Sequence, residues 1–221
     1  SYGRVCKNRV VPKVIGLLEE FKGHKELMLN VSRILSKISM DSECSKAIIA
    51  TKKLQFLTEL ISEYQTSTAF VVRIAFVLAN LTTYFDEARE QLGSADQILR
   101  ILQVALLYFE REDKTSSADE TNTTVARKGD EQKSIGANIE DTLVKLIRLI
   151  ANICTEEQYV QAVIAGGGKE LLYEFMARMV GSIEIKRLQK SEEFILNAVS
   201  CATNLLFYDN PSSGQTEIFD S

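Results

Sequence analysis

A short phrase occurs three times in this chain. The sequence reads "LANLTTYFDEARE" at residues 78–90, "IANICTEEQYVQA" at 150–162 and "ATNLLFYDN" at 202–210. Each copy has an Asn between a small residue and a large apolar one, near the end of a segment whose apolar residues recur with helical spacing. A phrase that returns in an otherwise dissimilar chain indicates one structural unit that is built several times.

The repeated unit contains a helix that we predict in four segments, 25–40, 68–83, 139–155 and 191–207. These segments align on Lys37, Asn80, Asn152 and Asn204. The first interval between these anchor residues is 43 residues, and the second is 72, of which a polar stretch at 110–138 supplies 29. The last interval is 52 residues. A helical period near 43 residues is typical of solenoids of the HEAT and armadillo types.

Between successive anchors we expect a short helix, a break and a longer helix. The breaks are "TKK" at 51–53, "GS" at 93–94 and "GGG" at 166–168. The units extend over about 1–41, 42–83, 84–154 and 155–207 of one array that spans 1–221, and the first unit has only the last two helices. We expect residues 208–221 to begin a further unit or to form a tail. No unit can bury its apolar face alone, so neighbouring units must stack.

The phrases "LANLT", "IANIC" and "ATNLL", together with "GGGKELLYEF", resemble armadillo repeats, and the resemblance covers essentially the whole chain. It implies an all-α, armadillo-type right-handed superhelical solenoid of about four three-helix repeats, with incomplete terminal repeats. The segments "NVSRILSKIS", "FVVRIAFVLANLT", "IEDTLVKLIRLIANI" and "EEFILNAVSCATNLLFY" also resemble armadillo proteins linked to cilia and flagella. This narrower resemblance implies a scaffold or adaptor in cilium or flagellum assembly, at the axoneme and radial spokes.

Composition excludes several other classes of protein. The net charge of −4 argues against a nucleic-acid-binding domain, and the longest apolar runs, such as "VALLYF" at 104–109, are too short to cross a bilayer. The single His and the four scattered Cys residues lack the close spacing of metal ligands, and we expect no metal, no cofactor and no enzyme. We expect the Cys residues to pack as free thiols in an intracellular, cytoplasmic protein. The chain starts with Ser, and we expect it to be part of a longer protein.

In armadillo proteins the third helix of each repeat lines the concave groove, so the polar stripe of these helices is the candidate binding surface. The stripe lies at offsets −7, −4, 0 and +3 from each anchor, and five of its sixteen residues are basic while none is acidic. Cations select acidic side chains, and Asn can hold a peptide backbone with one donor and one acceptor. We therefore predict that an acidic, extended protein segment contacts Arg33, Lys37, Arg73, Phe76, Asn80, Lys145, Arg148, Asn152, Asn197 and Asn204.

Two other interpretations of this stripe remain open. It can be an ordinary solvated face of a structural spacer that forms a homo-oligomer through its convex face or its open ends. It can also belong to a general cytosolic adaptor with no role in cilia. An import-receptor groove is disfavoured, because such grooves pair the Asn with a Trp four residues earlier and bind basic peptides. This chain has no Trp, and Arg33 and Arg148 occupy two of those positions.

The polar stretch at 110–138 is rich in Ser, Thr and charged residues and has few large apolar ones. We predict a disordered insert, since such a composition cannot bury enough apolar surface to order itself. It is either a tolerated surface loop or an arm near "TSSADET" that phosphorylation or a partner orders.

Overall fold

A computed structural model describes residues 10–121, 126–186 and 190–209, with side chains described in these ranges except at 116–121, 126–137, 184–186 and 209. All the regular structure in these ranges is helical. The helices are α2 (Val10–Glu20), α3 (Lys25–Ile38), α4 (Ser42–Ala50), α5 (Leu54–Glu63), α6 (Thr68–Tyr84), α7 (Asp86–Leu92), α8 (Ala95–Thr121), α9 (Ala126–Ile153), α10 (Glu157–Ala165), α11 (Lys169–Lys186) and α12 (Glu192–Asp209).

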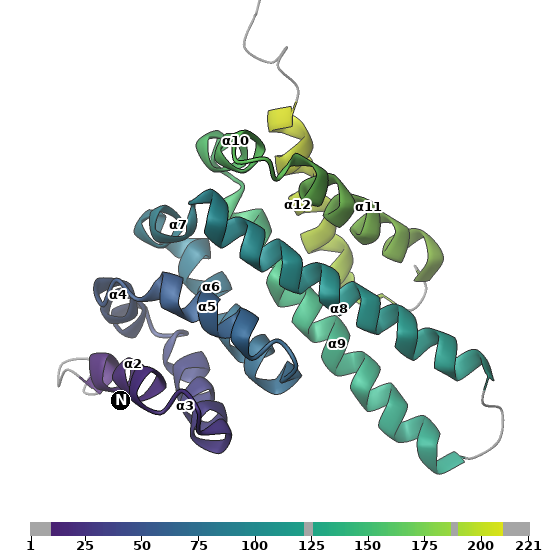
Figure 1. Ribbon diagram of the computed structural model, residues 1–221, viewed down its shortest axis with the longest axis horizontal. Helices are drawn as coiled ribbons and strands as arrows, with labels where there is room; N and C mark the ends of the chain where they lie inside the picture. Colours follow the sequence, from purple (N-terminus) through teal and green to yellow (C-terminus); the bar gives the residue numbers. More distant parts are fainter. Residues whose placement is uncertain (1–9, 122–125, 187–189, 210–221) are drawn as a thin grey trace, which may run out of the picture.

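The helices follow one another in sets of three, α4–α6, α7–α9 and α10–α12, after the pair α2 and α3. Figure 1 shows the short helices α4, α7 and α10 stacked along one edge, with α5, α8 and α11 running side by side. We call α3, α6, α9 and α12 the third helices; each packs against the next along the chain. The predicted armadillo-type helical solenoid is therefore confirmed. The division into units near 1–41, 42–83, 84–154 and 155–207 remains our working division, and residues 210–221 lie outside the described part of the chain.

Caps and tight turns explain where several helices start. Asp41 precedes α4, and its carboxylate accepts a hydrogen bond from the Cys44 amide at 3.0 Å, which satisfies one of the amides that a helix start leaves without a partner. The breaks before α5 and α11 each use a left-handed residue two positions before the helix, Lys52 (φ 55°) and Gly167 (φ 78°). At Gly168 a Cβ would lie 2.4 Å from a methyl carbon of Leu99, so this turn packs directly against α8.

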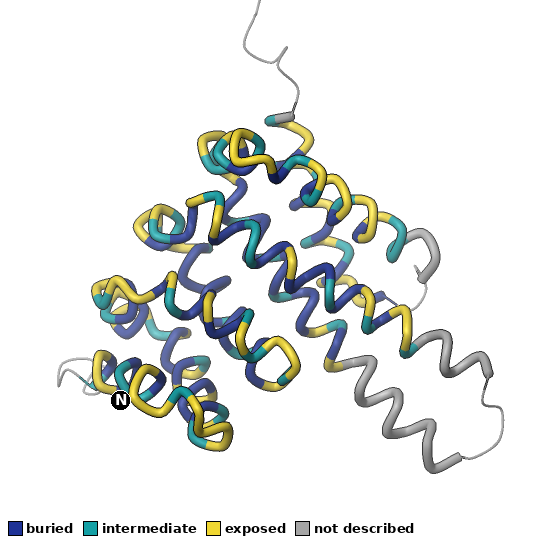
Figure 2. The backbone as a smooth tube through the Cα atoms, viewed as in Figure 1, coloured by how far each residue is buried: buried dark blue, intermediate teal, exposed yellow. Residues whose placement is uncertain are grey.

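The core follows the apolar offsets of the third helices. In α6 and α9 the residues at offsets −6, −5, −3, −2 and +1 are all buried, and Figure 2 shows the buried backbone where successive helices face each other. The exceptions lie at the two ends of the described array. Ile34 of α3 is 47% exposed, although its equivalents Val77 and Leu149 are fully buried. At the other end, Val199 of α12 is exposed and Ala202 is half-buried.

The described residues of the stretch at 110–138, predicted as a disordered insert, are helical, and disorder in the rest of the stretch stays a prediction. Helix α8 continues to Thr121 and α9 begins at Ala126, while residues 122–125 lie outside the described part. The stretch has no Pro and many helix-favouring residues, so its polarity argues against burial but not against a helix. Its first residues also contact α11 and the residues before α12: Asp113 accepts from Arg178 at 2.9 Å, and Glu112 pairs with the buried Lys190.

The cysteines differ from the expectation of four free thiols. Cys154 and Cys201 are free and buried, but Cys44 is disulfide-bonded. The cysteines alone therefore do not support the expectation that the protein is intracellular. Within the described ranges, none of the helices combines the length and the apolar character that a membrane crossing requires.

Candidate protein-binding groove

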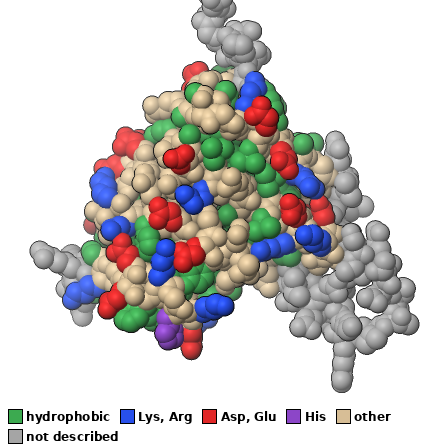
Figure 3. All heavy atoms as spheres, viewed as in Figure 1, with side chains coloured by type: hydrophobic (Ala, Val, Ile, Leu, Met, Phe, Trp, Pro, Cys, Tyr) green, Lys and Arg blue, Asp and Glu red, His purple; other side chains and the backbone are tan. Residues whose placement is uncertain are grey.

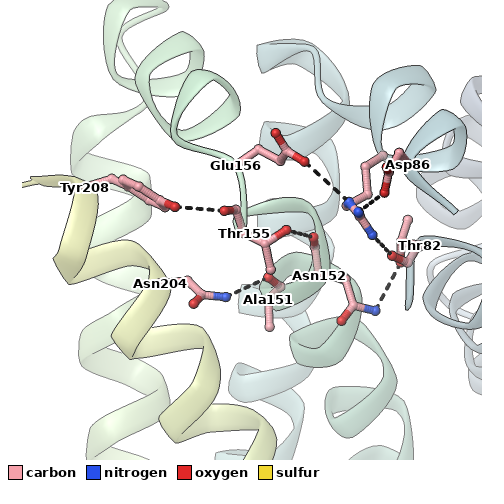
Figure 4. Close-up of polar contacts among 9 residues, drawn as sticks. Thr82, Asp86, Ala151, Asn152, Thr155, Glu156, Asn204 and Tyr208 are labelled. Atoms are coloured by element: carbon pink, nitrogen blue, oxygen red, sulfur yellow. Dashed lines mark hydrogen bonds and ion pairs between the residues drawn. The ribbon is translucent and has the colours of Figure 1, made fainter. Parts of the chain in front are cut away.

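Asn side chains link each third helix to the one before it. The Asn152 side-chain nitrogen donates to the Ala79 carbonyl at 3.1 Å, and the Asn204 nitrogen donates to the Ala151 carbonyl at 3.0 Å. Figure 4 shows the second of these contacts, together with the bond from Asn152 to the Thr82 hydroxyl. In both cases the anchor Asn reaches the carbonyl one residue before the preceding anchor. The recurring Asn therefore holds neighbouring repeats together.

The first Asn follows the same principle with a different acceptor. The Asn80 side-chain nitrogen donates to the Ser39 hydroxyl at 3.3 Å. All three anchor amides thus donate within the protein. An Asn amide has two N–H donors, so Asn80 and Asn204, with one described acceptor each, keep a second N–H and the amide oxygen for a protein ligand.

A polar cluster joins the ends of these helices to the short helices (Figure 4). Arg89 donates to the Thr82 carbonyl at 2.7 Å and forms ion pairs with Asp86 and Glu156. The Tyr208 hydroxyl donates to the Thr155 carbonyl at 2.8 Å. This cluster connects α6, α7 and α12 with the turn between α9 and α10, and its contacts lie within the protein apart from the buried Arg89 Nε, which has no hydrogen-bond partner among the described residues. We therefore assign it a structural role.

A cavity of about 660 Å³ opens between the α3–α4 turn and α6, and its size is within the range of ligand pockets. Three of the predicted contact residues, Phe76, Asn80 and Arg148, meet here. The remaining lining residues are Ser39, Met40, Ser42, Ser45, Tyr84 and Phe85. Met40 and Tyr84 expose most of their surface. The described lining thus combines apolar, hydroxyl and amide side chains with one cation and no acid.

Four predicted cations stand in the part of the groove formed by α3, α6 and the facing side of α9. Arg33 and Lys37 are exposed, Arg73 donates to the Leu29 carbonyl at 3.1 Å, and Arg148 donates to the Thr83 hydroxyl at 3.1 Å. Burial lowers the pKa of Arg73, and the positive charge of Arg33 lowers it further, so these two guanidinium groups lie close together. None of the four forms an ion pair with another described residue.

The groove toward α12 has a different character. Lys145 forms ion pairs with Glu193 at 2.8 Å and with Asp141 at 3.4 Å. The Asn197 side chain donates to the Glu193 carbonyl of its own helix at 2.8 Å. Lys145, Asn197 and Asn204 therefore do not join the pocket. The ten predicted residues divide into a basic part around the pocket and an internally paired part beyond it.

Some of the pocket walls lie outside the set of predicted contact residues. Met40 lies on the polar stripe, three residues after Lys37, and its place among polar positions was an available signal. Tyr84 is the last residue of α6, and Phe85 lies between α6 and α7, where helical periodicity does not apply. Their approach to the α3–α4 turn depends on how the repeats stack.

Sets of three helices that stack through their third helices form an armadillo-type helical solenoid. The chain is 28% identical over 206 residues to armadillo repeat-containing protein 2 of Homo sapiens, and the match covers 92% of the chain. It is 27% identical over 207 residues to the Mus musculus protein of that name, covering 91%. The match spans only 22% of the length of either relative. No family model matches the chain, and no solved structure gives a significant match.

Proposed function

We propose that this chain is a non-catalytic protein-binding scaffold whose groove binds an acidic, extended protein segment in its basic part. The observation that carries the proposal is the group of four cations, Arg33, Lys37, Arg73 and Arg148, without ion pairs among the described residues. Acidic side chains usually neutralise clustered cations within a protein, and a chain with more acids than bases offers many of them. A ligand with carboxylates would supply the missing charges.

The other face of the molecule supports this assignment by contrast. Figure 3 shows acidic and basic side chains interspersed on the face that α5, α8 and α11 form. Several of the described cations there are paired, as in Lys22 with Glu63 at 2.6 Å and Arg178 with Asp113 at 2.9 Å. A region of one sign raises the local concentration of oppositely charged partners and speeds their encounter. The basic part of the groove is therefore the favoured surface for an acidic segment.

The proposal narrows the set of contact residues. Arg33, Lys37, Arg73 and Arg148 supply the charge, while Phe76 and Asn80 form the pocket beside them. Asn152, Asn197, Asn204 and Lys145 act mainly within the repeat array through the bonds described above. The ligand is a protein rather than a nucleic acid or a membrane, because a polyanion or a membrane surface would require more cations than this region offers.

A ciliary or flagellar setting, in axoneme or radial-spoke assembly, is part of the proposal through the family resemblance in the sequence. Its alternative is a general cytosolic adaptor. Expression of the fluorescently tagged protein in ciliated cells separates the two. The proposal requires accumulation at the ciliary base or in the axoneme, and an even distribution through the cytosol would contradict it.

The groove itself is tested by selecting from a random peptide library with a pair of charge variants. Arg33→Glu/Lys37→Glu reverses two exposed cations of the groove, and Lys13→Glu/Lys46→Glu makes the same charge change on α2 and α4. We expect the wild type and the Lys13/Lys46 variant to enrich peptides rich in Asp and Glu, with binding that weakens as salt rises. The groove variant should lose this enrichment. Enrichment of neutral or basic peptides, or equal enrichment by both variants, would contradict the proposal.

A further inference from the structure

The outer face of α12 carries a row of exposed apolar side chains. Leu196, Val199 and Leu206 are 62%, 57% and 58% exposed. With Thr203 they follow the spacing of three, four and three residues that places side chains on one face of a helix. A soluble protein has many single exposed apolar residues, but a continuous row of this kind marks an interaction surface.

The same positions are covered on the preceding third helix. Relative to the anchor Asn, Leu196, Val199 and Leu206 lie at offsets −8, −5 and +2. Their equivalents are Val144 and Ile147 of α9 and Cys154, which directly follows α9, and these are 2%, 0% and 1% exposed. In α9 this row includes offset −1, and the carbonyl at that offset accepts the hydrogen bond from Asn204 of α12. The face is therefore buried because the next third helix lies on it.

Helix α6 shows the same relation one step earlier. Ala75 and Thr82, at offsets −5 and +2, are fully buried, and the Ala79 carbonyl at offset −1 accepts from Asn152 of α9. In both interfaces, between α6 and α9 and between α9 and α12, the covered residues lie at offsets −5 and +2, and the carbonyl at offset −1 accepts the hydrogen bond from the Asn of the next third helix. On α12 the corresponding acceptor is the carbonyl of Thr203, an exposed residue.

We propose that this face of α12 is the docking surface for one partner helix, which packs on α12 as α12 packs on α9. The chemistry of that helix follows from the helices already seated in this way. Both have an Asn with apolar residues six and three positions before it and one position after it. In α9 and α12 these residues are Leu146, Leu149 and Ile153, and Ala198, Cys201 and Leu205. The Asn of the partner helix donates to the Thr203 carbonyl.

A second copy of this chain fits the surface less well. The described helices with the required pattern, α6, α9 and α12, already use it against their own neighbours. The remaining third helix, α3, exposes Ile34 but has Lys37 in place of the Asn. A partner helix with a free Asn therefore matches the surface better than another folded copy. The inference is independent of the acidic ligand proposed for the groove, since α12 contributes no residue to the pocket.

The test uses a synthetic helix with the required pattern. A fluorescein-labelled peptide with the sequence of residues 139–155, carrying Cys154→Ser and stapled on its polar side, is first shown to be helical by circular dichroism. Its binding to the wild-type chain is then measured by fluorescence anisotropy. The stapling is needed because an isolated helix of this length is marginal in water. We expect saturable binding, with a peptide Asn152→Ala change weakening it by about threefold or more.

The matched protein variants are Val199→Asp/Leu206→Asp and the groove variant Arg33→Glu/Lys37→Glu. The first should weaken binding by about tenfold or more, because it places two carboxylates on the apolar row. The second should bind the helix as the wild type does, which separates this surface from the groove. Absence of binding by the helical peptide, or equal binding by the α12 variant, overturns the proposal. So does a dimer in sedimentation equilibrium that the α12 variant abolishes, since a second copy would then be the occupant.

Discussion

The outer faces of α9 and α12 have the same register and nearly the same chemistry, but their surroundings differ. Ile147 and Val199 are both β-branched and stand five residues before an anchor Asn; the first is fully buried and the second is 57% exposed. The difference lies in the next helix, which is present on α9 and absent from the described residues beyond α12. In a stacked array, an apolar residue becomes part of the core only when its neighbour is in place.

At the other end of the array, α3 likewise has an apolar face without a described neighbour, but it is the face that other third helices turn toward the preceding repeat. Ile34 of α3 is half exposed, whereas Val77 and Leu149 at the same offset are fully buried. Each third helix therefore has one apolar face for the preceding repeat and another for the following one. Only α6 and α9 have a described neighbour on both faces. The predictions below compare the covered and uncovered versions of the same positions.

The largest difference in the free energy of unfolding is expected between the Ile147→Asp and Val199→Asp variants. The first substitution buries an unpaired carboxylate and should lower the free energy of unfolding by about 4 kcal/mol or more, a large part of the stability of a domain. The second places the same charge in water and should change it by less than about 0.5 kcal/mol. Urea unfolding followed by circular dichroism measures both. Comparable losses in the two variants would mean that the α12 face is covered within the folded chain.

The fold was predictable because its determinants are local. Apolar residues with helical spacing defined the third helices, and the bounds of α3 and α6 agree with the predicted segments within two residues. The lengths of α8 and α9 were not predicted. Low hydrophobicity at 110–138 was interpreted as disorder, yet a helix can extend from a packed base into solvent when its residues favour helical dihedral angles. Periodicity reports which residues are buried, and it gives no information about a helix that buries none.

The candidate site was less predictable. The sequence indicated which side chains share the groove face but not which of them pair with each other. Lys145 and Arg148 are three residues apart on one helix, yet Glu193 of α12 neutralises only the first. The Asn donors likewise appeared free until their acceptors on the neighbouring helices were known. Such pairings depend on the rotation between adjacent repeats, which no single-helix pattern contains.

The second comparison concerns the reactivity of thiols at offset +2, where Cys154, the residue directly after α9, corresponds to Leu206 of α12. Burial raises the pKa of Cys154 to about 12, so the folded protein keeps it as a neutral, covered thiol at pH 8. In a Leu206→Cys variant the new thiol should react with maleimide at least about a thousandfold faster than Cys154, which must wait for local opening.

Mass spectrometry of timed reactions assigns the label to each cysteine. The same reaction in urea provides the control, because both thiols should then react at similar rates. Equal protection of both thiols in the folded chain would show that α12 is covered at this position, and equal reactivity would show that α12 does not cover α9. Above pH 9 the wild-type chain should lose stability, because the unfolded chain ionises thiols that the fold keeps protonated.

The next effect in size concerns the Asn bonds between third helices. Asn152 donates to the Ala79 carbonyl and contacts the hydroxyls of Thr82 and Thr83, whereas Asn204 has the single acceptor Ala151. Asn152→Ala leaves more polar groups unsatisfied and should cost about 1–3 kcal/mol of unfolding free energy. Asn204→Ala should cost about 0.5–1.5 kcal/mol. Asn197→Ala is the control, since that side chain bonds only within its own helix. A larger loss for Asn204 than for Asn152 would contradict the interpretation.

The smallest effect is expected for the ion pair that crosses from α9 to α12. Lys145 and Glu193 are 2.8 Å apart, but the Glu193 side chain is 53% exposed, and Asp141 at 3.4 Å offers Lys145 a second partner. A double-mutant cycle with Lys145→Met and Glu193→Gln should therefore give a coupling free energy of about 0.2–0.5 kcal/mol, and this should decrease in high salt. A coupling above about 1 kcal/mol would mean that water is excluded from this edge. The interpretation that the outer face of α12 is open to water would then be wrong, because water can be excluded here only if something lies against the start of α12.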